Sequence, residues 1–175
     1  MSRSAREQAR ALVATEVAFF ALTAAAAFGF CRLFIGWSFL PPLLLAAAGS
    51  HLLAAACRRR GWNVVFALVA SAAGLALLVT LAFYRSTSFY GLPTMDTWNA
   101  MWADLELAWS QFSTAKAPVP ADTGYVVAAV IGVWAAAFLA DCFAFRALAS
   151  IEAILPSGIL FVFAAAHTPM TAATT

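Results

Sequence analysis

The segment TGYVVAAVIGVWAAAFLADCFAF, from Thr123 to Phe145, is an apolar run that contains one charged residue, Asp141. A helix of about 20 predominantly apolar residues is long enough to cross the hydrocarbon core of a bilayer. The run lacks the amphipathic periodicity that a helix of a soluble bundle shows. We therefore predict that this segment spans a membrane.

The composition of the whole chain points to the same environment. Of its 175 residues, 64% are hydrophobic and 10% are charged, whereas roughly a quarter are charged in an ordinary soluble domain. A water-soluble fold of this size could not cover its surface with so few polar residues, so we expect the lipid bilayer to be its partner. The net charge of +2 and the scattered arginines argue against a nucleic-acid surface.

Four further apolar stretches, residues 11–34, 37–57, 63–84 and 151–168, predict additional spans. Pro156 and Gly158 interrupt the last stretch, which predicts either a kinked helix or a helix that begins near Pro156. The predicted fold class is an all-α, polytopic transmembrane helical bundle of about five spans. Residues 1–175 would form a single membrane domain.

A polar interlude, residues 85–122, separates the third and fourth spans, and its second half has a helical pattern. Five large apolar side chains recur there at spacings of three and four residues: Trp98, Trp102, Leu105, Trp109 and Phe112. This pattern predicts an amphipathic helix over residues 97–113, with Asp96 as its cap. Its aromatic face either packs at the membrane interface and on the bundle, or docks a partner such as a downstream catalytic domain.

The distribution of arginine predicts the orientation, because loops rich in Arg and Lys stay cytoplasmic. One side of the predicted bundle carries Arg3, Arg6, Arg10, Arg58, Arg59, Arg60 and Arg146. We therefore expect a multi-pass protein of the cytoplasmic membrane with its amino terminus inside the cell. The carboxyl terminus and the amphipathic helix would be extracytoplasmic.

Small residues recur every fourth position in two spans. The second span has Ala46, Ser50 and Ala54, and the fourth has the run Ala128, Gly132, Ala136 and Ala140. Such stripes allow helix backbones to approach closely in lipid. The abundance of alanine in this chain explains the stripes equally well.

Ionisable groups are costly inside a membrane span and therefore mark candidate sites. Five of them fall at a similar depth near the predicted inner leaflet: Glu16, His51, Asp141, Arg146 and Glu152. One interpretation is a structural cluster of buried ion pairs centred on Asp141 and Arg146. The other is a proton or ion relay, which would make the chain a small transporter or channel subunit.

No complete active site is visible in the sequence. Cys142 adjoins Asp141, but adjacent helical residues point in different directions, and no cleft for catalysis is evident. The cysteines Cys31, Cys57 and Cys142 have no metal-binding or redox spacing. We therefore expect neither an enzyme nor a cofactor or metal site in this chain, and we expect His167 to be an interfacial residue.

The stretch APVPADTGYVVAAVIGVWAAAFLADCFAFRALASIEAILPSGILFVF, from Ala117 to Phe163, resembles the amino-terminal membrane domain of bacterial TgpA-type transglutaminase-like proteins, particularly those of actinobacteria. The resemblance rests on the Pro-rich entry, the TGY start of a span, the LAD and AFR elements around Asp141 and Arg146, and the EAILPSG turn.

In that family the membrane domain precedes an extracytoplasmic transglutaminase-like domain with catalytic Cys, His and Asp residues. None of those residues has a counterpart in this chain, and we expect the chain to be a fragment or a truncated product. The resemblance thus implies a membrane anchor and a regulator of an enzyme domain encoded downstream.

Overall fold

The computed structural model describes residues 3–112, 114–149 and 151–167. The six α-helices are α1 (Arg3–Gly29), α2 (Leu40–Arg59), α3 (Val64–Phe83), α4 (Met95–Phe112), α5 (Thr123–Asp141) and α6 (Leu155–Ala166). The short elements are η1 (Phe30–Arg32), β1 (Phe34–Ile35), η2 (Arg85–Thr87), β2 (Val119–Pro120), η3 (Cys142–Arg146) and η4 (Glu152–Ile154). The prediction of an all-α helical bundle is confirmed.

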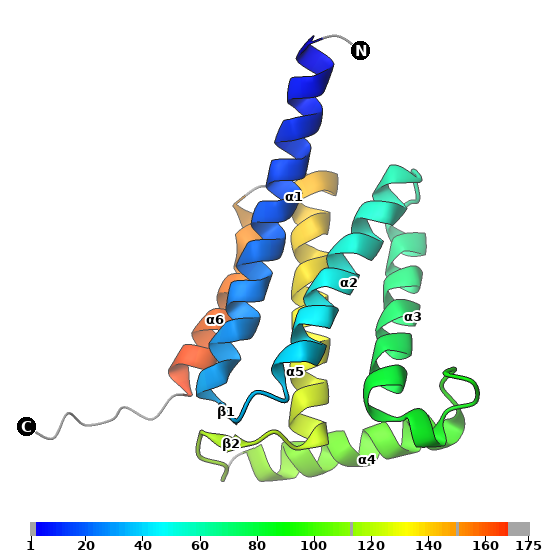
Figure 1. The fold of residues 1–175 in the computed structure, drawn as a ribbon, viewed down its shortest axis with the longest axis vertical. Helices are drawn as coiled ribbons and strands as arrows, with labels where there is room; N and C mark the ends of the chain where they lie inside the picture. The colour runs from blue at the N-terminus through cyan, green and yellow to red at the C-terminus, as the bar shows by residue number, and fades with distance from the viewer. Residues whose placement is uncertain (1–2, 113, 150, 168–175) are drawn as a thin grey trace, which may run out of the picture.

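Five helices, α1, α2, α3, α5 and α6, run roughly alongside one another, and α4 lies across one end of the bundle (Figure 1). The start of α1, the α2–α3 turn and the end of α5 lie at the opposite end from α4 (Figure 1). Helix α6 returns toward α4, so the start of α1 and the end of α6 lie at opposite ends of the bundle (Figure 1).

Among the described residues, four helices are long and apolar enough to cross a membrane: Arg10–Arg32, Leu40–Arg59, Val64–Phe83 and Thr123–Arg146. These helices are compatible with a membrane protein. The predicted span 151–168 differs, because its described helical part, Glu152–Ala166, is shorter and residue 168 lies outside the described residues. Helix α6 starts at Leu155, so Pro156 lies in its first turn, where a missing N–H does no harm.

Helix α5 is the centre of the bundle, because it contacts each of the other five α-helices. Its side chains are buried around most of its circumference, including Val127, Val130 and Val133. Ala46, Ser50 and Ala54 of α2 are also buried, and α2 packs closely on α5. The small-residue stripe of α5 divides: Ala136 and Ala140 are buried, whereas Ala128 is exposed and Gly132 is half-buried.

Helix α4 begins with a capping box instead of the predicted cap, Asp96. The Thr97 amide donates to Thr94 Oγ1 at 3.3 Å, and the Thr94 amide donates to Thr97 Oγ1 at 3.2 Å. A threonine hydroxyl one turn back satisfies the free amides of the first turn, as in other capping boxes. Asp96 lies inside the first turn, where a negative charge interacts favourably with the helix dipole.

The crossing of α4 over α5 depends on Gly124, which is buried in the first turn of α5. A Cβ atom at Gly124 would overlap the backbone carbonyl of Asp104 and press on Ala108. The Tyr84 hydroxyl also donates to Asp104 Oδ2 at 2.8 Å, which ties the end of α3 to α4. Glycine thus allows the two helix backbones to touch.

Candidate functional site

Three helices meet at an ion network near the end of the bundle opposite α4. Arg58 Nη2 in the last turn of α2 lies 2.7 Å from Glu16 Oε1 of α1 and 3.1 Å from Asp141 Oδ1 of α5. Arg59 Nη2 lies 2.8 Å from the other Glu16 oxygen, Oε2. A cation in the last turn of a helix is also favoured by the helix dipole.

The Arg58–Asp141 pair is largely removed from the surface of the molecule, whereas the Arg59 side chain is 65% exposed. The Asp141 side chain is 3% exposed and that of Arg58 is 20% exposed, and the Arg58 guanidinium carbon lies 3.9 Å from the centre of the Phe145 ring. A buried carboxylate without a counter-ion is strongly destabilising, so Arg58 neutralises the charge that Asp141 brings into the bundle. Asp141 Oδ2 and Arg58 Nε have no hydrogen-bond partner within the described part of the chain.

Asp141 and Arg146 were predicted to belong to one cluster, but no ion pair within the described ranges includes Arg146. Arg146 ends the π-helical turn Cys142–Arg146, and its Nη1 donates to the backbone carbonyl of Trp62 at 2.8 Å. Arg146 therefore attaches the end of α5 to the α2–α3 turn, while Arg58 from another helix pairs with Asp141.

Glu152 does not join the cluster either. It is exposed at the start of η4, and no ion pair within the described ranges includes it. Because Glu152 precedes α6, it lies near the same end of the bundle as the other predicted cluster members. Its carboxylate, however, stays at the surface.

His51 belongs to a second polar group, about two helical turns from Arg58 on α2. Thr23 Oγ1 lies 3.1 Å from His51 Nε2 and 3.1 Å from Ser157 Oγ of α6. Thr23 is likewise about two turns from Glu16 on α1, so α1 and α2 pair polar residues at two successive levels. The sequence predicted His51 as a cluster member, but neither Thr23 nor Ser157.

Trp134 of α5 completes the links at this second level. Ser50 Oγ donates to the Trp134 carbonyl at 2.8 Å, and Trp134 Nε1 donates to Ser71 Oγ of α3 at 2.8 Å. The indole ring lies against Gly49 and Gly74, where added Cβ atoms would come within 3.1 Å of it. Polar side chains thus join α1, α2 and α6 through Thr23, and α2, α3 and α5 through Trp134.

Beyond this second level, toward α4, the interior is mainly apolar. The core cluster there contains Phe30, Phe39, Leu43, Val126 and Val127, all buried. The two polar levels therefore do not continue as a path of charged groups through the described core. Their evident effect is to connect helices that hydrophobic packing alone would not orient in lipid.

The second candidate region is the predicted aromatic face of α4, whose helix is observed. Trp98, Trp102, Trp109 and Phe112 are exposed, and Leu105 is half-buried. Helix α4 packs on the bundle through a neighbouring strip that includes Thr97, Asp104 and Ala108. Most of the indole surface therefore remains free of the bundle, with Trp109 80% exposed.

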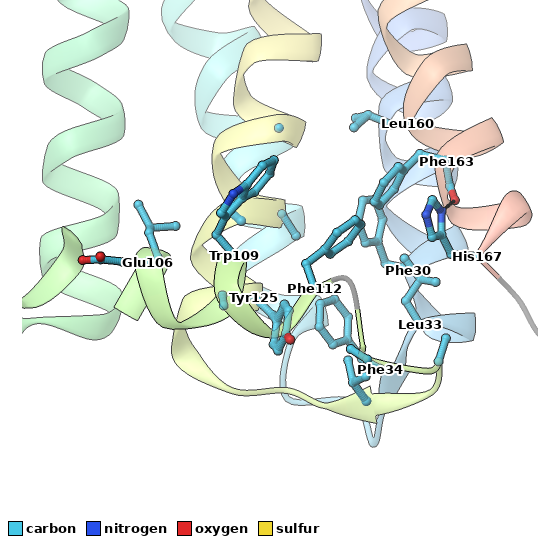
Figure 2. A pocket seen from close by; sticks show the side chains of 18 of the residues that line it. Phe30, Leu33, Phe34, Glu106, Trp109, Phe112, Tyr125, Leu160, Phe163 and His167 are labelled. Carbon is cyan, nitrogen blue, oxygen red and sulfur yellow. Dashed lines mark hydrogen bonds between the residues drawn. The ribbon is translucent and has the colours of Figure 1, made fainter. Parts of the chain in front are cut away.

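Four of the five predicted face residues, all except Trp98, line a cavity of about 960 Å³. Its other walls are α5, at Ala128 and Gly132, and α6, at Ile159 and Leu160 (Figure 2). At the α4 end the cavity is closed by the parallel pair β1 and β2, where the Val119 amide donates to the Leu33 carbonyl at 2.8 Å.

Three rings connect α4 and α6 at the edge of this cavity. Phe112 stacks on Phe163 with 6.2 Å between ring centres, and His167 lies 5.7 Å from Phe112 and 4.5 Å from Phe163. Figure 2 shows these rings beside one another where α4 passes the end of α6. His167 thus contacts two aromatic rings at the end of α6, and its expected place at the membrane interface stays a prediction.

Comparison with known proteins gives no match: no family model, no curated protein and no solved structure is significantly similar to this chain. The resemblance of residues 117–163 to TgpA-type membrane domains therefore stays a prediction.

Proposed function

We propose that this chain is a membrane-anchoring and scaffold domain, the amino-terminal part of a TgpA-type transglutaminase-like membrane protein, with no complete active site of its own. The observation that carries the proposal is the Arg58 pairing with Glu16 and Asp141, which joins three helices. Paired charges that neutralise one another suit a structural role. The arginine-rich end faces the cytoplasm and α4 lies on the extracytoplasmic side, in keeping with the positive-inside rule.

The anchor role is tested by fusing a reporter that is active only outside the cytoplasm, such as alkaline phosphatase, after Thr175. The fusion should remain in the membrane fraction after an alkaline carbonate wash and should show enzyme activity. Release by carbonate would contradict membrane anchoring. An inactive reporter in a carbonate-resistant fusion would contradict the proposed orientation.

The alternative is a small transporter or channel subunit. Its supporting observation is that Thr23, His51 and Ser157 extend hydrogen-bonding groups beyond the ion network. The apolar core beyond them argues against a continuous route. Proton flux into liposomes that contain the purified chain and a trapped pH dye distinguishes the two. The anchor proposal expects the same flux as the leak of liposomes without protein, whereas a flux that Asp141→Asn abolishes would favour transport.

A further inference from the structure

The cavity beside α4 begins at the level of exposed indoles and continues along helices that would lie in lipid. Trp102 and Trp109 are exposed at its α4 wall, and exposed indoles are characteristic of the membrane–water interface. Ala128 and Gly132 in its α5 wall belong to a helix long and apolar enough to span a bilayer. The cavity therefore runs from the interface toward the hydrocarbon core.

The hollow results from small residues on one helix facing large residues on two others. Ala128, Ala129 and Gly132 form the α5 wall, while α4 and α6 contribute aromatic and aliphatic side chains. A Cβ atom at Gly132 would come only within ordinary contact distance of Leu160, 3.4 Å. In a bilayer, an apolar hollow of this kind is filled by whatever surrounds the helices, and that is lipid.

The few polar groups of the lining suit an apolar occupant. Glu106 is exposed on α4, and His167 directs Nδ1 to the Phe163 carbonyl, 2.9 Å away. The remaining polar side-chain groups in the lining are the Tyr125 hydroxyl and the indole N–H groups of Trp102 and Trp109. The volume of about 960 Å³ lies at the upper end of the range typical of small-molecule sites, about 300–1,000 Å³.

We propose that this cavity is a lipid site that takes an acyl chain of a phospholipid from the extracytoplasmic leaflet. The acyl chain lies between α4, α5 and α6, and the headgroup of the phospholipid lies at the level of the indoles. This proposal rests on the proposed function, which places the helices in a membrane. It adds a bound lipid that holds α4 on the bundle.

The first test measures phospholipid retained by the protein after purification in a mild detergent, by native mass spectrometry. Wild-type protein should retain about one phospholipid per chain, and Ala128→Phe, which fills the cavity, should lose most of it. The matched control is Ala76→Phe, at an exposed position of α3 outside the cavity lining, and it should retain the lipid. Equal retention by both variants would overturn the proposal.

A second test does not depend on a cavity-filling variant. Wild-type protein, Trp109→Phe and Trp98→Phe are reconstituted in phosphatidylcholine vesicles with or without bromine atoms on the acyl chains. Brominated acyl chains should quench the emission of Trp109 more strongly than the emission of Trp98, which lies outside the cavity lining. The contribution of each indole is obtained by comparing Trp109→Phe with Trp98→Phe. Equal quenching of the two indoles would contradict a bound chain.

The outcomes also separate this proposal from the anchor role and from other occupants. Carbonate-resistant protein without retained lipid would refute the lipid site alone, whereas carbonate release would refute the anchoring. A dimer that Ala128→Phe dissociates would assign the cavity to a second copy of the chain and overturn the lipid site.

Discussion

Arg58 Nη2 lies 3.1 Å from Asp141 Oδ1, although the two residues are 83 positions apart in the chain. The same nitrogen lies 2.7 Å from Glu16 Oε1. A single guanidinium thus fixes α1, α2 and α5 relative to one another at the arginine-rich end of the bundle. In a bilayer, where hydrophobic burial does not drive helices together, such a contact determines which helices are neighbours.

Arg58→Gln should lower the free energy of unfolding in detergent by about 3 kcal/mol, because it leaves the Asp141 carboxylate buried and unpaired. Arg60→Gln is the control, since Arg60 is exposed after the last turn of α2, and it should change stability by less than about 0.5 kcal/mol. Similar losses in the two variants, measured by thermal unfolding, would contradict a structural network.

A double-mutant cycle identifies the partner of Asp141. Arg58→Gln and Asp141→Asn should be coupled by about 1 to 3 kcal/mol, because they remove the same contact. Arg146→Gln and Asp141→Asn should be nearly additive, because Arg146 donates to the Trp62 carbonyl. The reverse pattern would identify Arg146, and not Arg58, as the partner of Asp141.

Gly124→Ala should loosen α4 from the bundle, because the new Cβ would overlap the Asp104 carbonyl. Forcing a methyl group into such a contact costs about 1 to 3 kcal/mol. Gly132→Ala is the matched control on the same helix, since its Cβ faces the cavity at 3.4 Å from Leu160. Limited proteolysis around α4 should accelerate in Gly124→Ala but not in Gly132→Ala, and equal rates would argue against a close α4–α5 crossing.

Tyr84, just beyond the end of α3, predicts a pH dependence. Burial, and then the hydrogen bond to the Asp104 carboxylate, raise the pKa of Tyr84 above its ordinary value of 10.0. The folded state therefore favours the neutral phenol, and this contribution is complete below pH 10 and lost as the pH rises through the folded pKa. Tyr84→Phe should cost about 1 kcal/mol at pH 8.

The difference in melting temperature between wild type and Tyr84→Phe should shrink above a pH of about 10. All other titratable groups are present in both proteins, so the comparison cancels their effect. A difference that stays constant from pH 8 to pH 11 would contradict the role of Tyr84.

The apolar runs predicted most of the fold because helix length and hydropathy are local properties. The α4 helix was likewise predicted from the spacing of Trp98, Trp102 and Trp109. Its contact face was not predicted, because Gly124 and Tyr84, which hold α4 on the bundle, belong to neighbouring elements and not to the helix itself. The exposed indoles of Trp102 and Trp109 instead line a cavity whose opposite walls come from α5 and α6.

Only part of the polar cluster was predicted, because its contacts also join distant parts of the chain. Depth placed Glu16 and Asp141 at one level, but depth does not define which helices are adjacent. Arg58 was assigned to a cytoplasmic loop as one of three consecutive arginines, although α2 extends to Arg59 and carries it inward. Trp134 gave no local signal, since its partners Ser50 and Ser71 lie on two other helices.

The central claim is that the Arg58 end of the bundle faces the cytoplasm and α4 lies outside the cell. Single cysteines test it in a background without Cys31, Cys57 and Cys142. Ser110 of α4 and Ala147, directly after η3, are both exposed, and α4 lies at the opposite end of the bundle from the end of α5 (Figure 1). In intact cells, an impermeant maleimide should label Ser110→Cys and should reach Ala147→Cys only after the membrane is permeabilised. Labelling of both positions in intact cells, or of Ala147→Cys alone, would contradict the account.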